Sequence, residues 1–252
     1  MIADPGEPVD LFVTCVVDAL MPDVGVASVK VLRASGCAVD VPRGQTCCGQ
    51  PAWNAGFVDE AAAVASTTLD ALDANPARVI VVPAGSCATM IRVYWPTLFE
   101  LAGRPDRAAR ARAVGARTRE LTEYLATSPL PPAPITPGGE AAVACHHGCH
   151  MTRELHLKDP PLEVLRRVGV PAAMWDGERC CGFGGTFSVT LPEASVTMAD
   201  QKLDSLPAGV DTIVGADPSC LLQLGRRAAA RGLDVKTRHI AEVLADALEE
   251  QH

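Results

Sequence analysis

Long apolar stretches are absent from this sequence of 252 residues. Its most apolar run, residues 79–84, is followed at once by Gly85 and Ser86, whereas a helix that spans a membrane needs about 20 apolar residues. Residues 1–10 hold three acidic side chains and two prolines, with no basic start and no apolar segment, which is not the pattern of a signal peptide. We therefore expect a cytoplasmic protein without a membrane span, which reaches a membrane face only through its partners.

Basic and aromatic residues are also scarce. Lysine and arginine number 22 against 30 aspartates and glutamates, so the formal net charge is −8, and aromatic residues make up 4% of the chain. Proteins that bind nucleic acids usually carry a basic stripe or an aromatic stacking platform. The sequence shows neither, so we expect no nucleic-acid partner. The length and a hydrophobic content of 48% predict a globular protein with one large core or two small ones.

Cysteine, in contrast, is abundant, with ten residues. Without an export signal we expect a reducing compartment, where structural disulfides are rare and dense cysteine indicates metal or redox chemistry. Eight of the ten form two series of four: Cys15, Cys47, Cys48 and Cys87, then Cys149, Cys180, Cys181 and Cys220. The offset between the series is 134 positions for the first pair and 133 for the other three.

The offset of 133 also relates residues on both sides of these cysteines. It carries Leu32-Arg33 onto Leu165-Arg166, Gly36 onto Gly169, Gly49 onto Gly182, Glu60 onto Glu193, Ile80 onto Ile213 and Ser86 onto Ser219. Agreement of this extent predicts an internal duplication. Residues 128–139 (SPLPPAPITPGG) contain five prolines and are typical of a stiff, extended linker. We therefore expect one domain over residues 1–127 and a second over residues 140–252.

Each half shows the pattern strand, helix, strand, helix, strand, helix. Short strands are expected at residues 10–14, 37–41 and 78–82, and again at 141–144, 172–175 and 212–215. Helices are expected at residues 24–34, 59–72 and 86–98, the last with Ser86 as its N-cap, and again at 155–168, 193–206 and 219–231. Residues 104–125 should add a helix to the first half, and residues 233–236 and 239–248 should close the chain. This alternation implies parallel sheets and hence two tandem Rossmann-like α/β domains.

The paired cysteines follow the expected strands. Cys15 comes directly after the first strand, Cys47 and Cys48 lie in the loop after the second, and Cys87 lies just past the third. The carboxyl ends of parallel strands meet at one edge of a sheet, where α/β folds place their ligands. The sequence therefore predicts that four thiols converge in the first half, and that the corresponding four converge in the second.

Four thiols at one place indicate a metal centre. Four thiolates carry about four negative charges, which a partly buried site holds only with a cation. Helix N-termini near the cysteines would add positive dipole ends. Gly49, Gly182 and Gly184, together with Gly185, would let the backbone approach closely and offer N–H groups to sulfur.

Both zinc and iron–sulfur clusters accept four cysteines. Compact zinc sites usually take two C-x-x-C-like pairs, whereas here the ligands come from three loops and include an adjacent pair, Cys47-Cys48 or Cys180-Cys181. Neighbouring side chains diverge, so they reach two atoms of a larger cluster more readily than one ion. The pattern favours iron–sulfur, with one or two clusters, over zinc. A vicinal disulfide and unremarkable thiols stay as alternatives for the adjacent pairs.

A cysteine, a Cys-Cys-Gly tripeptide and a further cysteine, all present twice, resemble the cysteine-rich CCG domain family. The segments that carry the resemblance are FVTCVVDAL at Cys15, QTCCGQPAWNAG at Cys47, VPAGSCATM at Cys87, HHGCH at Cys149, CCGFGGTFSV at Cys180 and ADPSCLLQLG at Cys220. They span nearly the whole chain. The family includes the heterodisulfide reductase B subunit and the iron–sulfur subunit of glycolate oxidase, and the similarity is greatest to the lactate utilization protein A group.

The resemblance implies an iron–sulfur protein of the 4Fe-4S type that transfers electrons in the oxidation of L-lactate to pyruvate. It also implies partners, namely other iron–sulfur or flavin subunits of a lactate or glycolate oxidation complex. The heterodisulfide reductase type has a fifth cysteine per repeat in a C-x-x-C pair. Here the positions three residues from Cys87 and Cys220 are Ala84, Met90, Asp217 and Gln223. This departure favours a simpler four-cysteine cluster.

For several residues the sequence leaves more than one role open. Cys37 and Cys145 have no repeat partner, and we expect them to pack in the core. His146, His147 and His150 surround Cys149 and would ligate or tune a cluster, or only shape the loop. For the whole chain, two alternatives to electron transfer are a metal-free thiol–disulfide oxidoreductase that uses the vicinal cysteines and a zinc-stabilised scaffold. The residues do not identify a catalytic acid or base.

Overall fold

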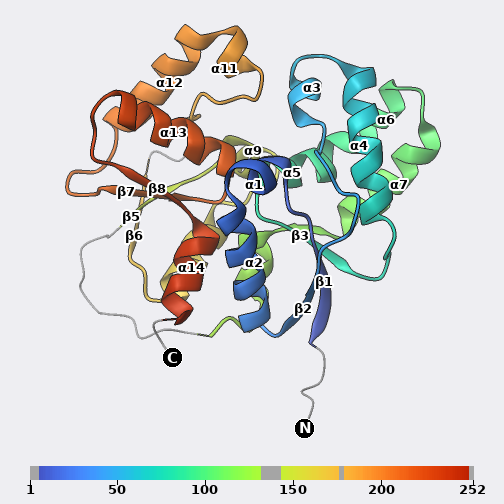
Figure 1. Cartoon of the computed structure of the whole chain (residues 1–252), viewed down its shortest axis with the longest axis horizontal. Coiled ribbons are helices and arrows are strands. Elements are labelled where there is room, and N and C mark those ends of the chain that lie inside the picture. The colour runs from blue at the N-terminus through green and yellow to red at the C-terminus, as the bar shows by residue number, and fades with distance from the viewer. Residues whose placement is uncertain (1–5, 132–142, 176–178, 250–252) are drawn as a thin grey trace.

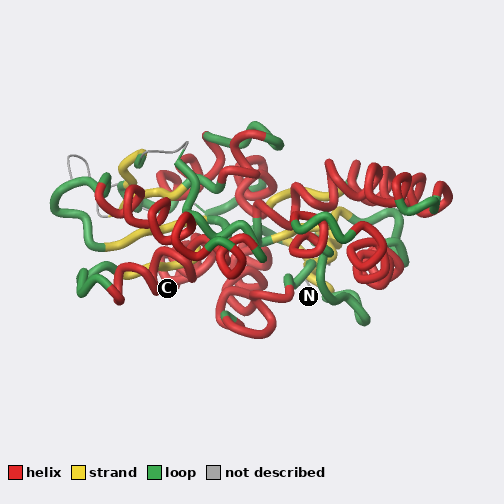
Figure 2. Tube along the Cα trace, turned by 90° about the horizontal axis from the view of Figure 1, so that it is seen from above, coloured by secondary structure: helices red, strands yellow, loops and turns green. Residues whose placement is uncertain are grey.

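The computed structural model describes residues 6–131, 143–175 and 179–249 (Figure 1). It contains two four-stranded sheets in which neighbouring strands are parallel. The first has the order β2-β1-β3-β4 and the second the order β6-β5-β7-β8, so the two halves repeat one topology. Seen from above, the strands of the two sheets lie apart along the long axis, with helices between them (Figure 2). The predicted fold class, a duplicated Rossmann-like α/β fold, is confirmed.

The strands are short, and the central ones are apolar. The first sheet consists of β1 (Glu7–Leu11), β2 (Cys37–Asp40), β3 (Val79–Val82) and β4 (Thr118–Glu120). The second consists of β5 (Val143–His146), β6 (Ala172–Met174), β7 (Thr212–Gly215) and β8 (Lys236–His239). Ile80, Val81 and Val82 are fully buried, as expected for a central parallel strand that is covered on both faces.

Helices follow the strands in both halves. In the first half they are α1 (Cys15–Leu20), α2 (Pro22–Ala34), α3 (Gln50–Asn54), α4 (Val58–Leu72), α5 (Gly85–Thr89), a π-helical turn η1 (Met90–Tyr94), α6 (Trp95–Leu101), α7 (Pro105–Ala116) and α8 (Leu121–Thr127). In the second half they are α9 (Cys149–Arg153), α10 (Asp159–Arg167), α11 (Phe187–Thr190), α12 (Pro192–Asp204), α13 (Pro218–Ala230) and α14 (Ile240–Glu249). The short helices α1, α3, α9 and α11 show too few residues for a helical period, so the sequence does not predict them.

The single helix expected at residues 104–125 is wrong. The structure places α7 there, then the edge strand β4, then α8. β4 pairs with β3, and the Arg117 guanidinium donates a hydrogen bond to the Arg78 carbonyl at 2.8 Å. Glu120 then caps α8, because its carboxylate accepts from the backbone N–H groups of Thr122 and Glu123. Pairing with β3 therefore overrides the helical composition of the segment.

Three further predicted element boundaries differ from those in the structure. The first strand ends at Leu11 rather than at residue 14, because Thr14 is the N-cap of α1 and its hydroxyl accepts from the Val17 N–H. Ser86 is not an N-cap; α5 begins one residue earlier, at Gly85, and Ala84 is its N-cap. The helix expected at residues 155–168 begins only at Asp159, where two prolines occupy the first turn.

The two halves pack through reciprocal contacts. Helix α2 lies against α14, and its repeat counterpart α10 lies against α8, the counterpart of α14. In the same way α5 contacts α9, and α1 contacts α13. Each contact therefore occurs twice with the halves exchanged, which is the signature of pseudo-two-fold symmetry. One hydrophobic core runs across the boundary and includes Leu11 and Val31 of the first half with Val214 and Leu244 of the second.

Most of the predicted linker lies outside the described residues. Its first part, residues 128–131, runs along the second half, where the Arg167 guanidinium donates to the carbonyls of Ser128 and Leu130 at 2.9 and 2.8 Å. Within the described ranges, no helix combines the length and the apolar content that crossing a bilayer requires.

Candidate metal centres

Four cysteines of the first half meet at the carboxyl edge of the first sheet. Cys15 begins α1, Cys87 lies in α5, and Cys47-Cys48 immediately precede Gly49, the N-cap of α3. The sulfurs of Cys15 and Cys47 are 3.5 Å apart, and those of Cys48 and Cys87 are 3.4 Å apart. We call these four residues the first quartet.

The second half repeats this arrangement. Cys149 begins α9, Cys220 lies in α13, and Cys180-Cys181 precede Gly182. The sulfurs of Cys149 and Cys180 are 3.9 Å apart, and those of Cys181 and Cys220 are 3.0 Å apart. We call these four residues the second quartet. The structure thus brings together all eight cysteines that the repeat pairs, in two groups of four.

The glycine after each Cys-Cys pair is required by geometry. Gly49 and Gly182 both adopt a φ of +85°, which favours glycine. A Cβ atom at Gly49 would lie 2.7 Å from the Ala61 carbonyl oxygen, and one at Gly182 would lie 2.4 Å from that of Ser195. Their N–H groups donate to the sulfurs of Cys47 and Cys180, at 3.5 and 3.4 Å. These two glycines therefore offer the predicted N–H groups to sulfur.

Gly184, the third predicted glycine, has a different place. It has a φ of +56°, and a Cβ there would meet the side chain of Phe187. It lines the cavity beside the second quartet, but among the hydrogen bonds of the described residues its N–H makes none to sulfur. Its role is to shape the loop before α11.

One thiol in each quartet is held as a thiolate. Hydrogen bonds from the thiols of Cys15 and Cys48 lower the pKa of Cys47 to about 3. Hydrogen bonds from Cys149 and Cys181 lower the pKa of Cys180 to about 2. The four donor thiols have raised pKa values because they share their protons with these thiolates and are desolvated. A cation that replaced the shared protons would allow every thiol of a quartet to ionise.

The walls of the two quartets differ in polarity. Phe12 belongs to the same apolar cluster as Cys48 and Cys87, and the indole N–H of Trp95 donates to the Cys48 carbonyl at 2.8 Å. Around the second quartet lie buried polar side chains, namely His146, Lys202 and Asp217. The Lys202 ammonium sits 4.4 Å from the centre of the Trp175 ring. The duplicated halves therefore surround their thiols with different chemistry.

His146 is a buried polar group beside the second quartet. One of its ring nitrogens and the sulfurs of Cys181 and Cys220 all lie within 4.8 Å of one another. Burial lowers the pKa of His146 to about 3, so its imidazole is neutral at physiological pH. His147 is accounted for differently, because its Nε2 atom lies 2.9 Å from the Lys158 carbonyl. His150 lies beside a different thiol, with its Nδ1 atom 3.9 Å from the Cys149 sulfur.

A small cavity of about 50 Å³ adjoins the second quartet, and residues of both halves line it. The first half contributes Gln50 and Asn54 of α3 and Ser86 of α5. The Gln50 amide donates to the Ser86 carbonyl at 3.2 Å, and the Ser86 N–H donates to Asp217 at 2.8 Å. The first half thus closes over the thiols of the second. This cavity has room for only a few inorganic atoms, because pockets that bind small organic molecules usually have volumes of about 300 Å³ or more.

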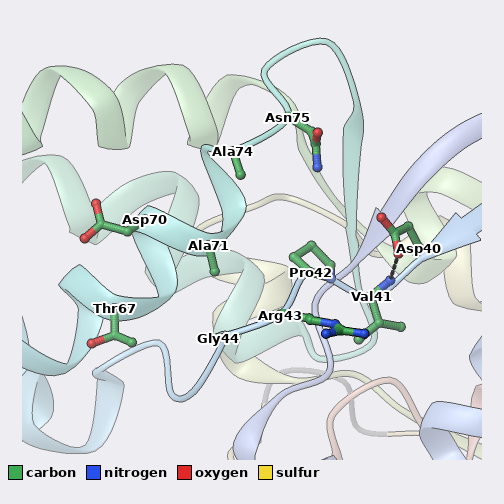
Figure 3. A pocket seen from close by; sticks show the side chains of 10 residues that line it. All are labelled: Asp40, Val41, Pro42, Arg43, Gly44, Thr67, Asp70, Ala71, Ala74 and Asn75. Carbon is green, nitrogen blue, oxygen red and sulfur yellow. Dashed lines mark hydrogen bonds between the residues drawn. The ribbon is translucent and has the colours of Figure 1, made fainter.

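A wider surface pocket of about 720 Å³ lies between the end of β2 and α4 (Figure 3). Neither cysteine nor histidine lines it. Its two acidic residues have other partners, because Asp70 pairs with Arg107 and Arg110, and Asp40 pairs with Arg78. We therefore do not regard it as a candidate site.

Cys37 and Cys145 lie in the hydrophobic core, in agreement with the packing role expected for them. The Cys37 sulfur lies 3.3 Å from the Tyr124 hydroxyl. Sequence reasoning missed two residues near the second quartet. Asp217, which stands before Pro218 and caps α13, carries an N-cap signal that would have found it. Lys202 carries none, because a lysine on a helix is usually exposed.

Comparison with known proteins agrees with this geometry. A family model described as "Cysteine-rich domain" (CCG) matches residues 9–92 and 143–225, one copy per half. Lactate utilization protein A of Exiguobacterium sp. is 42% identical over 247 residues, which are 96% of this chain and 98% of that protein. The proteins of the same name from Geobacillus kaustophilus and Bacillus subtilis are 42% and 38% identical, over 94% of this chain and 98% of each relative. The chain therefore belongs to the cysteine-rich CCG domain family, among the relatives of lactate utilization protein A.

Proposed function

We propose that this chain is an iron–sulfur, electron-transfer subunit of a multi-subunit system that oxidises L-lactate or a related 2-hydroxy acid. The observation that carries the proposal is the gathering of eight thiols into two quartets, with nearest sulfurs 3.0–3.9 Å apart. The names of the relatives, lactate utilization protein A, supply the link to lactate. The partners would be other iron–sulfur or flavin subunits, and the oxidation of the substrate would take place on one of them.

Three features of the quartets suit an iron–sulfur cluster. Each quartet offers four thiols, the number of cysteine ligands that a 4Fe-4S cluster takes. Each has a glycine N–H directed at a cysteine sulfur, and hydrogen bonds to sulfur tune cluster potentials. The cavity beside the second quartet leaves room for further inorganic atoms. When bound, such a cluster would supply a one-electron relay between the partner that oxidises the substrate and the electron acceptor.

The residues of this chain would hold the clusters and control their surroundings. The eight cysteines are the proposed ligands. Phe12 and Trp95 exclude water from one side of the first quartet, where both are fully buried. Gln50 and Ser86 close the cavity of the second. A low-dielectric environment with few mobile waters reduces the reorganisation that accompanies electron transfer.

A zinc-stabilised scaffold is the second candidate, and one observation favours it. Four sulfurs at about 2.3 Å from one zinc ion lie about 3.8 Å apart along the edges of the tetrahedron. The sulfur separations of 3.4–3.9 Å in three of the four pairs are close to this value. The metal analysis below distinguishes the two candidates.

The test is anaerobic purification followed by analysis of iron, acid-labile sulfide and zinc. The proposal predicts a brown protein with iron and sulfide in similar amounts and an electron paramagnetic resonance signal in one oxidation state. Cys48→Ala should lose metal, whereas the matched control Cys37→Ala, which removes a core thiol outside the quartets, should keep it. A colourless protein with stoichiometric zinc would reject the proposal in favour of the scaffold. A metal-free protein whose thiols titrate reversibly with mild oxidants would support the thiol–disulfide alternative.

A further inference from the structure

The imidazole of His146 is buried beside the second quartet without a hydrogen-bond partner. The side chain lies at the end of β5 and is 1% exposed. Among the described residues, neither Nδ1 nor Nε2 of this ring has a hydrogen-bonding partner. Its ring contact with Trp175, with centroids 6.2 Å apart, does not engage a ring nitrogen in a hydrogen bond. Buried polar groups are almost always satisfied, and an exception calls for an unseen water or ion.

The surroundings of the ring indicate whether its missing partner is a water molecule or a metal ion. A neutral imidazole offers one nitrogen lone pair, and the metal-binding atoms grouped with it are the sulfurs of Cys181 and Cys220, within 4.8 Å. Two thiolates and an imidazole nitrogen at this separation form a typical donor set for a transition metal. A water molecule, in contrast, would need two or more good hydrogen-bonding partners, and thiols are weak ones.

The repeat shows that this imidazole is not part of the shared architecture. The offset that relates Cys15 to Cys149 relates Phe12 to His146. Phe12 belongs to the same apolar cluster as Cys48 and Cys87, whereas His146 lies beside Cys181 and Cys220. A phenyl ring at this repeat position in the first half buries no polar atom that would need a hydrogen-bonding partner. A histidine in the second half therefore calls for a role beyond packing.

We propose that His146 is a metal ligand of the second quartet, so that the second centre has a mixed sulfur and nitrogen donor set while the first is bound by thiolates alone. The proposal rests on the proposed function in one respect, namely that the quartets bind metal. It goes beyond that function because it makes the two centres chemically different. Among the other histidines near the site, His147 is engaged by the Lys158 carbonyl, and His150 serves as the control.

The test uses Co²⁺ as the probe, because its absorption reports its donors. The full chain is stripped of metal under anaerobic, reducing conditions and titrated with Co²⁺, and two ions are expected to bind per chain. X-ray absorption of the loaded wild-type protein should show the outer-shell scattering of an imidazole ring in addition to sulfur. His146→Phe, which copies the first half, should lose this scattering and weaken one of the two sites by at least about tenfold. The matched control, His150→Phe, should retain both.

Each result decides the question. A wild-type cobalt protein without imidazole scattering, or a His146→Phe protein that keeps it, would overturn the role of His146 and leave the metal centres standing. A chain that binds no cobalt would overturn both. Iron and sulfide analysis of the protein before stripping tests the proposed function separately. If circular dichroism shows that His146→Phe does not fold, His146→Gln is used instead. Imidazole scattering that persists in His150→Phe would still support His146 as the ligand.

Discussion

The carboxylate of Asp217 accepts a hydrogen bond from the Ser86 N–H at 2.8 Å, across the boundary between the two halves. The same carboxylate accepts from the N–H and the hydroxyl of Ser219, at 3.2 and 2.6 Å, and so caps α13. Because the repeat counterpart of Asp217 is Ala84, this link exists on one side only. A single side chain thus ties the start of α5, which carries Cys87, to the start of α13, which carries Cys220.

Substitutions of Asp217 should separate its two roles. Asp217→Asn keeps an oxygen that can cap α13 but places an amide NH₂ where the Ser86 N–H needs an acceptor, so we expect a loss of about 1–3 kcal/mol in the free energy of unfolding. Asp217→Ala also removes the cap and should lose about 1 kcal/mol more. Urea unfolding at neutral pH measures both. Asp246→Asn, at an exposed ion pair with Arg238, should change the stability by less than about 1 kcal/mol, and equal losses in all three variants would contradict this account.

The convergence of the cysteines could be predicted because it depends only on topology. Parallel strands that alternate with helices place their carboxyl ends at one edge, and the cysteines follow those ends in both halves. The buried strand β3 and the longer helices are also evident, because runs such as residues 79–82 and the apolar period of residues 58–72 are strong signals.

The rest depends on contacts between distant segments. The strand β4 reads Thr-Arg-Glu and has no apolar pattern; it is a strand because β3 offers an open edge. The place of His146 is likewise invisible in the sequence, where it is one of two adjacent histidines. At the end of β5, neighbouring side chains point to opposite sides, so His146 lies beside the thiols and His147 meets the Lys158 carbonyl. The register of β5 with β7 decides which of the two histidines lies beside the thiols.

Alanine at Gly49 should disrupt the first quartet. The new Cβ would lie 2.7 Å from the Ala61 carbonyl oxygen, in addition to the strain of a positive φ. Gly44→Ala is the matched control, because Gly44 has a φ of +87° with nothing within 4 Å of the added Cβ, so it should cost only the backbone strain of about 1–2 kcal/mol. We expect Gly49→Ala to lose clearly more stability in thermal unfolding, and to bind less metal. Equal effects of the two substitutions would show that the contact with α4 is unimportant.

Cys47 and Cys180 should be the most reactive thiols of the metal-free protein in weak acid. An ordinary cysteine has a pKa of about 8.5 and is almost fully protonated at pH 5, whereas hydrogen bonds lower the pKa of Cys47 to about 3 and that of Cys180 to about 2. The thiolate is the nucleophile, so iodoacetamide at pH 5 should label these two before Cys15 or Cys149, and the preference should vanish below about pH 3.

Peptide mapping by mass spectrometry measures the order of labelling. Cys37 is the internal control, because it is buried and burial raises its pKa. Metal bound at the quartets should protect both reactive thiols. Uniform labelling of all ten cysteines at pH 5 would show that the thiol-to-thiolate hydrogen bonds do not form in solution.

Glu120 should make the stability of the protein fall as the pH rises from about 4.5 toward neutrality. Burial raises the pKa of this carboxyl from its ordinary value of 4.5 to about 7. Below pH 4.5 the carboxyl is protonated in the folded and unfolded states, so its contribution is fully present. Between pH 4.5 and 7 Glu120 ionises in the unfolded chain before it ionises in the folded one. The free energy of unfolding therefore falls by about 3 kcal/mol, at 1.4 kcal/mol per pKa unit.

Glu120→Gln stays neutral and keeps an oxygen to cap α8, so urea unfolding from pH 4.5 to 8 should show the variant gaining stability relative to wild type. Glu163→Gln, at an exposed pair with Arg166, should show no such trend, and a difference between Glu120→Gln and wild type that stays constant with pH would mean that Glu120 is ionised in the folded protein.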